Sequence, residues 1–80
     1  MHSNEDIVLY TLTGCHLCEG AAAMLDRAGV AWRPVEIDES PELEKRYGLC
    51  IPVVYSVTTK RELLYPFGEE QLSRFLEGLL

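Results

Sequence analysis

With 80 residues, the chain has room for one small domain, which we expect to span residues 1–80. Apolar residues make up 48% of the sequence and charged residues 25%, which excludes a disordered chain, and no apolar run approaches the roughly 18 residues that a membrane span needs. The net charge of −6 argues against binding to nucleic acid or to an anionic membrane.

The first six residues are polar and acidic, so they resemble neither a signal peptide nor a transit peptide. Three cysteines, an odd number, fit poorly with a secreted disulfide framework. We therefore expect a reducing, cytoplasmic compartment. We also expect the protein to be a monomer.

The first half of the chain predicts a strand, a helix and a second strand. Residues 7–12 form a nearly continuous apolar run of β-forming residues, which is typical of an interior strand. A helical stripe of apolar residues covers 17–28 and stops at Gly29. Residues 30–37 have strand composition, but Pro34 cannot donate a ladder hydrogen bond, which indicates an edge strand. Such a unit predicts parallel strands joined by a right-handed crossover.

The second half predicts a short helix, a hairpin and a closing helix. Ser40 and Pro41 have the chemistry of an N-cap and a first helical position. Residues 52–56 and 62–65 are short β-rich segments separated by a polar turn, which predicts an antiparallel hairpin. The last helix starts at two glutamates and has an apolar stripe of Leu72, Phe75, Leu76 and Leu79.

A Cys-x-x-Cys pair lies where the first strand meets the first helix. Cys15 falls at the helix N-terminus, where free N–H groups and the helix dipole favour the thiolate, so it is the candidate nucleophile. Cys18 lies three residues further on, on the same face of the helix, where the following residues are mostly apolar. This position predicts that Cys15 is the exposed attacking thiol and Cys18 the buried resolving thiol. His16 either assists the thiolate as a cation or is a solvated surface imidazole.

The sequence resembles the glutaredoxin-like branch of the thioredoxin-fold superfamily. Two segments carry the resemblance: residues 13–18, Thr-Gly-Cys-His-Leu-Cys, and residues 48–54, Gly-Leu-Cys-Ile-Pro-Val-Val. The family's fold implies an α/β chain of order β-α-β-α-β-β-α, with a four-stranded mixed sheet flanked by helices. The resemblance also implies a cis Pro52 facing the cysteines, and a backbone at Ile51 that pairs with the substrate.

Further substrate contacts are implied at His16 and Leu17, which stand between the two cysteines, and at Gly68 and Glu70, where glutaredoxins bind the γ-glutamyl end of glutathione. The chain departs from glutaredoxins at Leu12, which replaces a lysine that holds a glutathione carboxylate. The resemblance thus implies at most half of a glutathione site.

We expect an enzyme, a dithiol–disulfide oxidoreductase that reduces protein disulfides or glutathione mixed disulfides. No bound cofactor is expected, although glutathione is a candidate external reductant. The alternative is a zinc or iron–sulfur module that uses Cys15, Cys18 and Cys50, although structural zinc normally needs four ligands. Otherwise Cys50 is a third redox thiol near the pair or, as we expect, a small buried apolar residue. A non-catalytic binding domain is a third interpretation, because fold does not fix function.

Overall fold

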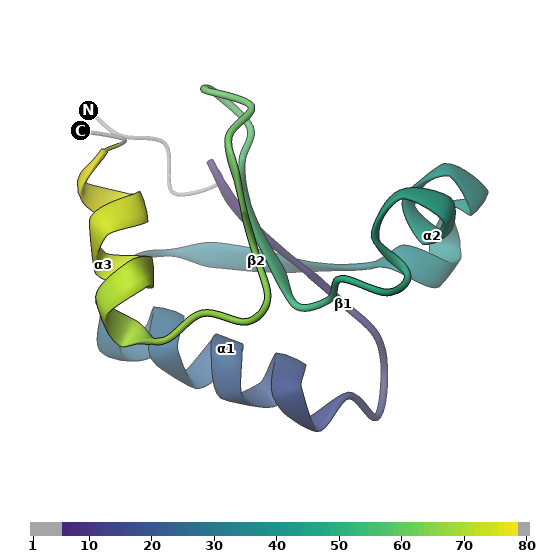
Figure 1. Ribbon diagram of the computed structural model, residues 1–80, viewed down its shortest axis with the longest axis horizontal. Coiled ribbons are helices and arrows are strands. Elements are labelled where there is room, and N and C mark those ends of the chain that lie inside the picture. Colours follow the sequence, from purple (N-terminus) through teal and green to yellow (C-terminus); the bar gives the residue numbers. More distant parts are fainter. Residues whose placement is uncertain (1–5, 79–80) are drawn as a thin grey trace.

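A computed structural model describes residues 6–78 of the chain (Figure 1). Its element order is β-α-β-α-β-β-α, as the sequence predicts, with one additional 3₁₀ turn, η1, that the sequence analysis missed. Residues 1–5 and the predicted stripe residue Leu79 lie outside the described part. The strands are β1 (Ile7–Thr11), β2 (Trp32–Glu36), β3 (Val53–Ser56) and β4 (Glu62–Leu64); the helices are α1 (His16–Arg27), η1 (Ile37–Glu39), α2 (Pro41–Tyr47) and α3 (Glu69–Glu77).

The four strands form one mixed sheet in the order β2-β1-β3-β4. β1 pairs in parallel with β2, whereas β3 is antiparallel to both β1 and β4. The interior position predicted for the first strand is therefore confirmed, as is the edge position of the strand that carries Pro34. The parallel register sets Leu9 opposite Pro34 and Thr11 opposite Glu36, at the carboxyl ends of β1 and β2.

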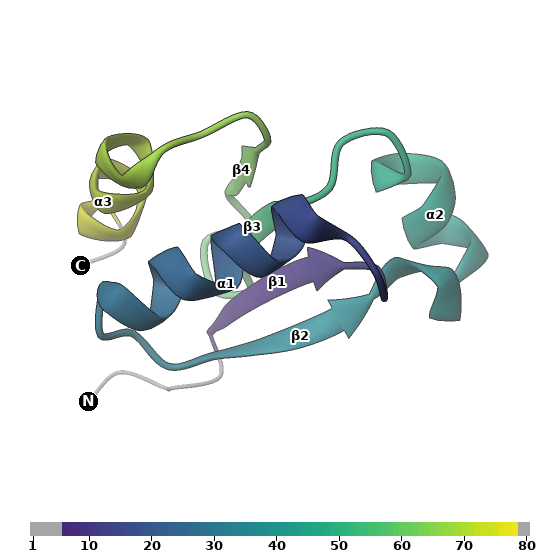
Figure 2. The ribbon, with the colours of Figure 1, turned by 90° about the horizontal axis from the view of Figure 1, so that it is seen from below.

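Helices α1 and α3 cover one face of the sheet, and Figure 2 shows α1 lying along β1 and β2. Alternate side chains of β1 meet the apolar stripes of the two helices, because successive strand residues point to opposite faces. The closing helix packs on the sheet as predicted. The buried residues of this core are Ile7, Leu9, Ala21, Leu25, Val54, Phe67, Leu72 and Phe75.

Helix α2 covers the other face near the carboxyl end of β1. Tyr47 is buried there, stacks on Tyr10 with 4.8 Å between ring centroids, and donates a hydrogen bond of 2.5 Å to the Glu62 carboxylate on β4. Burial and this hydrogen bond raise the pKa of Tyr47 far above its usual value. The Tyr47 side chain therefore connects α2 to strand β4 by a hydrogen bond.

Helix α2 begins at a capping residue, as the sequence predicts. The Ser40 side chain accepts a hydrogen bond from the Leu43 N–H.

A sharp turn connects β1 to α1. Gly14 has a φ of +85°, a left-handed conformation that glycine adopts without the steric cost of a Cβ. The turn brings the Cys15 N–H to the Leu12 carbonyl at 3.1 Å and starts α1 at His16, one residue before the predicted start. Within residues 6–78, no helix is both long enough and apolar enough to span a membrane.

Candidate active site

Cys15 is the N-cap of α1. Its backbone is extended, and its sulfur accepts a hydrogen bond of 3.2 Å from the backbone N–H of Cys18. In most helices this acceptor is the oxygen of serine, threonine, aspartate or asparagine. Here the acceptor is a thiol sulfur, so one of the free N–H groups of the helix terminus points directly at the candidate nucleophile. A hydrogen bond of this kind stabilises negative charge on the acceptor.

Cys18 lies one turn further along α1 and is almost completely enclosed, with 3% of its surface exposed. Burial raises the pKa of the Cys18 thiol, and its hydrogen bond with the Cys15 side chain raises it further. The Thr11 hydroxyl and the Leu12 backbone act in the opposite direction by hydrogen bonding to the Cys18 sulfur. All three cysteines are free thiols in the structure. The buried position predicted for Cys18 is confirmed.

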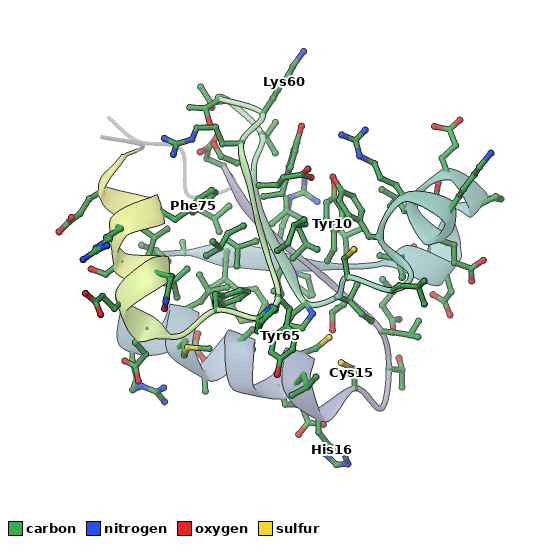
Figure 3. The ribbon with its side chains drawn as sticks, in the orientation of Figure 1. Tyr10, Cys15, His16, Lys60, Tyr65 and Phe75 are labelled. Carbon is green, nitrogen blue, oxygen red and sulfur yellow. The ribbon has the colours of Figure 1, made fainter. Side chains whose placement is uncertain are left out.

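The structure corrects the expected exposure of Cys15 and decides between the two positions considered for His16. Cys15 is half-buried rather than exposed, and its N–H donates to the Leu12 carbonyl within the turn that precedes it. The His16 side chain is exposed and points away from the molecule, as Figure 3 shows, so its position is that of a solvated surface imidazole. Leu17 is also exposed, at 51% of its surface, close to the cysteine pair in the chain.

The segment from Gly48 to Pro52 leads from α2 into β3, and its ends are fixed by backbone hydrogen bonds. The Cys50 N–H donates to the Tyr47 carbonyl at 2.8 Å, and the Tyr65 N–H donates to the Pro52 carbonyl at 3.2 Å. The Ile51–Pro52 peptide bond is cis, and so is Tyr65–Pro66, which the sequence analysis did not anticipate. Leu49 is fully exposed.

Two residues of this segment bear on function. Within residues 6–78, neither backbone group of Ile51 has a hydrogen-bond partner. Cys50 is half-buried and packs against the apolar cluster under α2, a position that suits a small apolar side chain.

Gly68 and Glu70 lie away from the cysteines. Gly68 is the N-cap of α3, and Glu70 forms an ion pair of 2.9 Å with Arg74 on its own helix. The neighbouring Glu69 pairs at 2.8 Å with Arg27, the last residue of α1, so the start of α3 lies beside the end of α1 opposite to the cysteines (Figures 1 and 2). A helix of this length separates its ends by about 16 Å at 1.5 Å per residue. The described structure therefore does not bring Gly68 or Glu70 together with the cysteine pair.

A cleft of about 430 Å³ opens beside the cysteines, on the α1 side of the edge strand β2. Cys15 and Cys18 line one end of it, and Trp32 and Pro34 line the part over β2. The sequence alone did not predict the polar residues that complete the lining of the cleft, because their convergence depends on the register of strands that are distant in sequence. These residues are Thr11, Thr13, Glu19, Glu36 and Glu39.

The described residues contain no group of three or more histidine, cysteine, aspartate or glutamate side chains that could hold a metal ion. In particular, Cys15, Cys18 and Cys50 do not form such a group within one chain.

A family model for the glutaredoxin-like domain (DUF836) matches residues 6–77, a range that includes the Cys15–Cys18 pair and Pro52. The chain belongs to the glutaredoxin-like family. The resemblance seen in the sequence is thereby confirmed. No curated protein sequence matches this glutaredoxin-like chain.

Solved structures agree with this assignment. The crystal structure of the structural genomics target XcR50 from X. campestris has a TM-score of 0.83 and 37% sequence identity, covering 90% of this chain and 96% of that chain. Protein Ne2328 from Nitrosomonas europaea has a TM-score of 0.77 and 25% identity, covering 94% of both chains. The glutaredoxin grx-1 from Archaeoglobus fulgidus, at 24% identity and a TM-score of 0.68, covers 90% of this chain and 86% of its own and shares the fold. The predicted thioredoxin fold is confirmed.

Proposed function

We propose that this glutaredoxin-like protein is a dithiol–disulfide oxidoreductase, with Cys15 as the nucleophile and Cys18 as the resolving thiol. The observation that carries the proposal is the hydrogen bond from the Cys18 N–H to the Cys15 sulfur at the tip of α1. Both cysteines line the cleft, Cys18 is the more buried of the two, and they lie one helical turn apart, which is a separation that an intramolecular disulfide can close after modest adjustment.

The reaction has two exchange steps. The Cys15 thiolate attacks one sulfur of a substrate disulfide; a bond forms between the two sulfurs, the substrate S–S bond breaks, and the second substrate sulfur leaves as a thiolate that takes up a proton. Cys18 then loses its proton and attacks the Cys15 sulfur, which releases the first substrate sulfur as a thiol. The substrate gains two electrons, and the protein retains a Cys15–Cys18 disulfide.

Two molecules of an external thiol such as glutathione must return the two electrons to close the cycle: the first forms a mixed disulfide with the protein, and the second attacks it, which leaves the reduced dithiol and the oxidised external disulfide. No bound cofactor takes part. Because Cys18 is buried and its pKa is raised, its deprotonation limits the second step near neutral pH. The Thr11 hydroxyl and the Leu12 N–H are the groups that stabilise its thiolate when it forms.

Substrate alignment falls to the segment before Pro52. The unpaired backbone N–H and C=O of Ile51 can pair with an extended peptide that carries the disulfide, in the manner of an added β-strand. Leu12, which replaces the glutaredoxin lysine, packs against the apolar cluster under α2 and offers no charge to a glutathione carboxylate. These features favour a disulfide in a protein or peptide over a glutathione adduct as the substrate.

The test compares Cys15→Ser with Cys18→Ser by intact mass, after incubation with a disulfide-bonded peptide and, separately, with oxidised glutathione. Cys18→Ser keeps the attacking thiol but has no resolving group, so it should accumulate a mixed disulfide, whereas Cys15→Ser should form none. A repeat in a Cys50→Ala background removes the third thiol as a source of adducts.

Other outcomes would overturn the proposal. If neither variant traps a partner and both lose bound zinc or iron, the metal module is the better interpretation, with ligands completed by a second chain. If neither variant traps a partner and no metal is present, the chain is a non-catalytic binding domain.

A further inference from the structure

The cleft beside the cysteines is acidic. Three glutamates line it together with Cys15 and Cys18: Glu19 from the first turn of α1, Glu36 from the end of β2 and Glu39 from η1. We call this cleft the acidic groove. Its volume of about 430 Å³ is within the range of sites that take a small ligand or a few side chains of a peptide.

The fold places two of the three carboxylates, those of Glu36 and Glu39, at the side of the groove that β2 and η1 form. The parallel register brings Glu36 opposite Thr11, at the carboxyl end of β1 from which the cysteine turn begins. The Thr13 hydroxyl donates a hydrogen bond to the Glu36 carboxylate, which holds this half-buried side chain beside the turn. Among the described residues, neither Glu36 nor Glu39 forms an ion pair.

Positive charge is absent from the groove lining in the described part of the chain. Arg33 and Arg46 act instead on Tyr10, where they lower the pKa of its hydroxyl against the larger effect of burial. Arg27 and Arg74 are paired with glutamates of α3. A charged substrate that reaches Cys15 through the groove therefore meets the negative potential of three carboxylates, and clefts of one charge sign select ligands of the other.

We infer that the acidic groove selects cationic disulfide substrates, in which a lysine or arginine lies within one or two residues of the reacting cysteine. This inference rests on the proposed function, because it concerns the substrate that Cys15 attacks. The anionic charge of glutathione makes its adducts the poorer class of substrate for this groove.

The first exchange step tests the inference in the Cys18→Ser protein. The substrates are three peptides, lysine–cysteine–lysine, glutamine–cysteine–glutamine and glutamate–cysteine–glutamate, each with blocked ends and each joined to the same neutral thiol, mercaptoethanol. Cys15 attacks the peptide sulfur, the peptide–mercaptoethanol bond breaks, and mercaptoethanol leaves as a thiolate that takes up a proton. Intact mass over time gives the rate of the peptide adduct.

We expect the lysine peptide to react about tenfold faster than the glutamine peptide at low salt, and the glutamate peptide to react more slowly than both. The advantage should shrink as sodium chloride approaches about 1 M, where the screening length falls to about 3 Å. At about 4 Å in water, one unscreened unit charge changes the rate of encounter with an oppositely charged group by about fivefold.

A matched pair of double variants separates the groove from overall charge. Glu36→Gln with Glu39→Gln removes two charges from the groove, whereas Glu42→Gln with Glu44→Gln removes two from exposed positions of α2 outside it. The first pair should lower the lysine-to-glutamine rate ratio substantially, with Glu19 as the remaining groove carboxylate, and the second should leave the ratio unchanged.

The outcomes are distinct. If no peptide forms an adduct with Cys15, the proposed function fails. If all three peptides react at equal rates, the function stands and the inference about the groove is wrong. An equal loss of the ratio in both double variants assigns the selectivity to the net charge of the protein and also overturns the role of the groove.

Discussion

Replacing Thr11 with valine should slow the second exchange step and leave the first step intact. Thr11 ends β1, is half-buried, and its hydroxyl hydrogen bonds to the Cys18 sulfur, where it lowers the pKa of that thiol against the larger effect of burial. Valine keeps the shape and the β-branch but removes the donor. The Cys18 thiolate then depends on the Leu12 N–H alone.

The size of the effect follows from the bond that is lost. A hydrogen bond to a charged group contributes about 1.5–3 kcal/mol, and because the Leu12 donor remains, we take the lower end, which corresponds to roughly a tenfold slower attack by Cys18. The rate should also rise with pH across the neutral range, because burial raises the pKa of Cys18 and only its thiolate attacks. In Thr11→Val this rise should extend to higher pH.

Rapid mixing of the reduced protein, in a Cys50→Ala background, with an aromatic disulfide whose thiolate product is coloured separates the two steps. The first release of colour reports the attack by Cys15, and the second reports the attack by Cys18. Thr13→Val is the matched control, since it removes the same hydroxyl from a side chain that donates to Glu36 and not to a sulfur. An unchanged second phase in a folded Thr11→Val protein, or equal slowing in both variants, would refute the reasoning.

Three further results are expected. Iodoacetamide near neutral pH should label Cys15 well before Cys18, because Cys18 is 3% exposed and its pKa is raised. Peptide mass spectrometry measures the labelling of each cysteine, and equal labelling of both in the folded protein would contradict the assignment of roles. Gly14→Ala should lower the free energy of unfolding in urea by about 1–2 kcal/mol because of its φ of +85°, whereas Gly20→Ala, a helical position with open space around it, should raise it by about 0.5–1 kcal/mol. Leu25→Ala, at a side chain with no exposed surface, should cost about 2–5 kcal/mol in the same assay, and a loss below 1 kcal/mol would mean that this core is not packed as described.

The element order of the fold could be predicted because each segment carries its own periodicity. The apolar run of β1, the stripe of α1 and the Ser40–Pro41 start of α2 are local signals, and Pro34 identified the edge strand because it lacks a backbone donor. The 3₁₀ turn at Ile37–Glu39 was missed because three residues are too few to show a period.

The site was only partly predictable. The different burial of Cys15 and Cys18 followed from their places on one helix, whereas the acidic groove depends on the register that sets Thr11 opposite Glu36, and a sequence does not show which residues of distant strands will pair. The distance of Gly68 from the cysteines is likewise a tertiary result, set by the packing of α3 against the far end of α1.

Leu49 is a position where the side chain can be substituted without loss of folding stability. Its side chain is fully exposed, while hydrogen bonds at Cys50 and Pro52 fix the backbone on the side that leads into β3. A substitution here loses no buried contact, yet the altered side chain stands two residues from Ile51, where a substrate peptide would pair. Position 49 is therefore the natural starting point for a library that retunes partner choice, and the variants it yields should unfold at the same urea concentration as the parent.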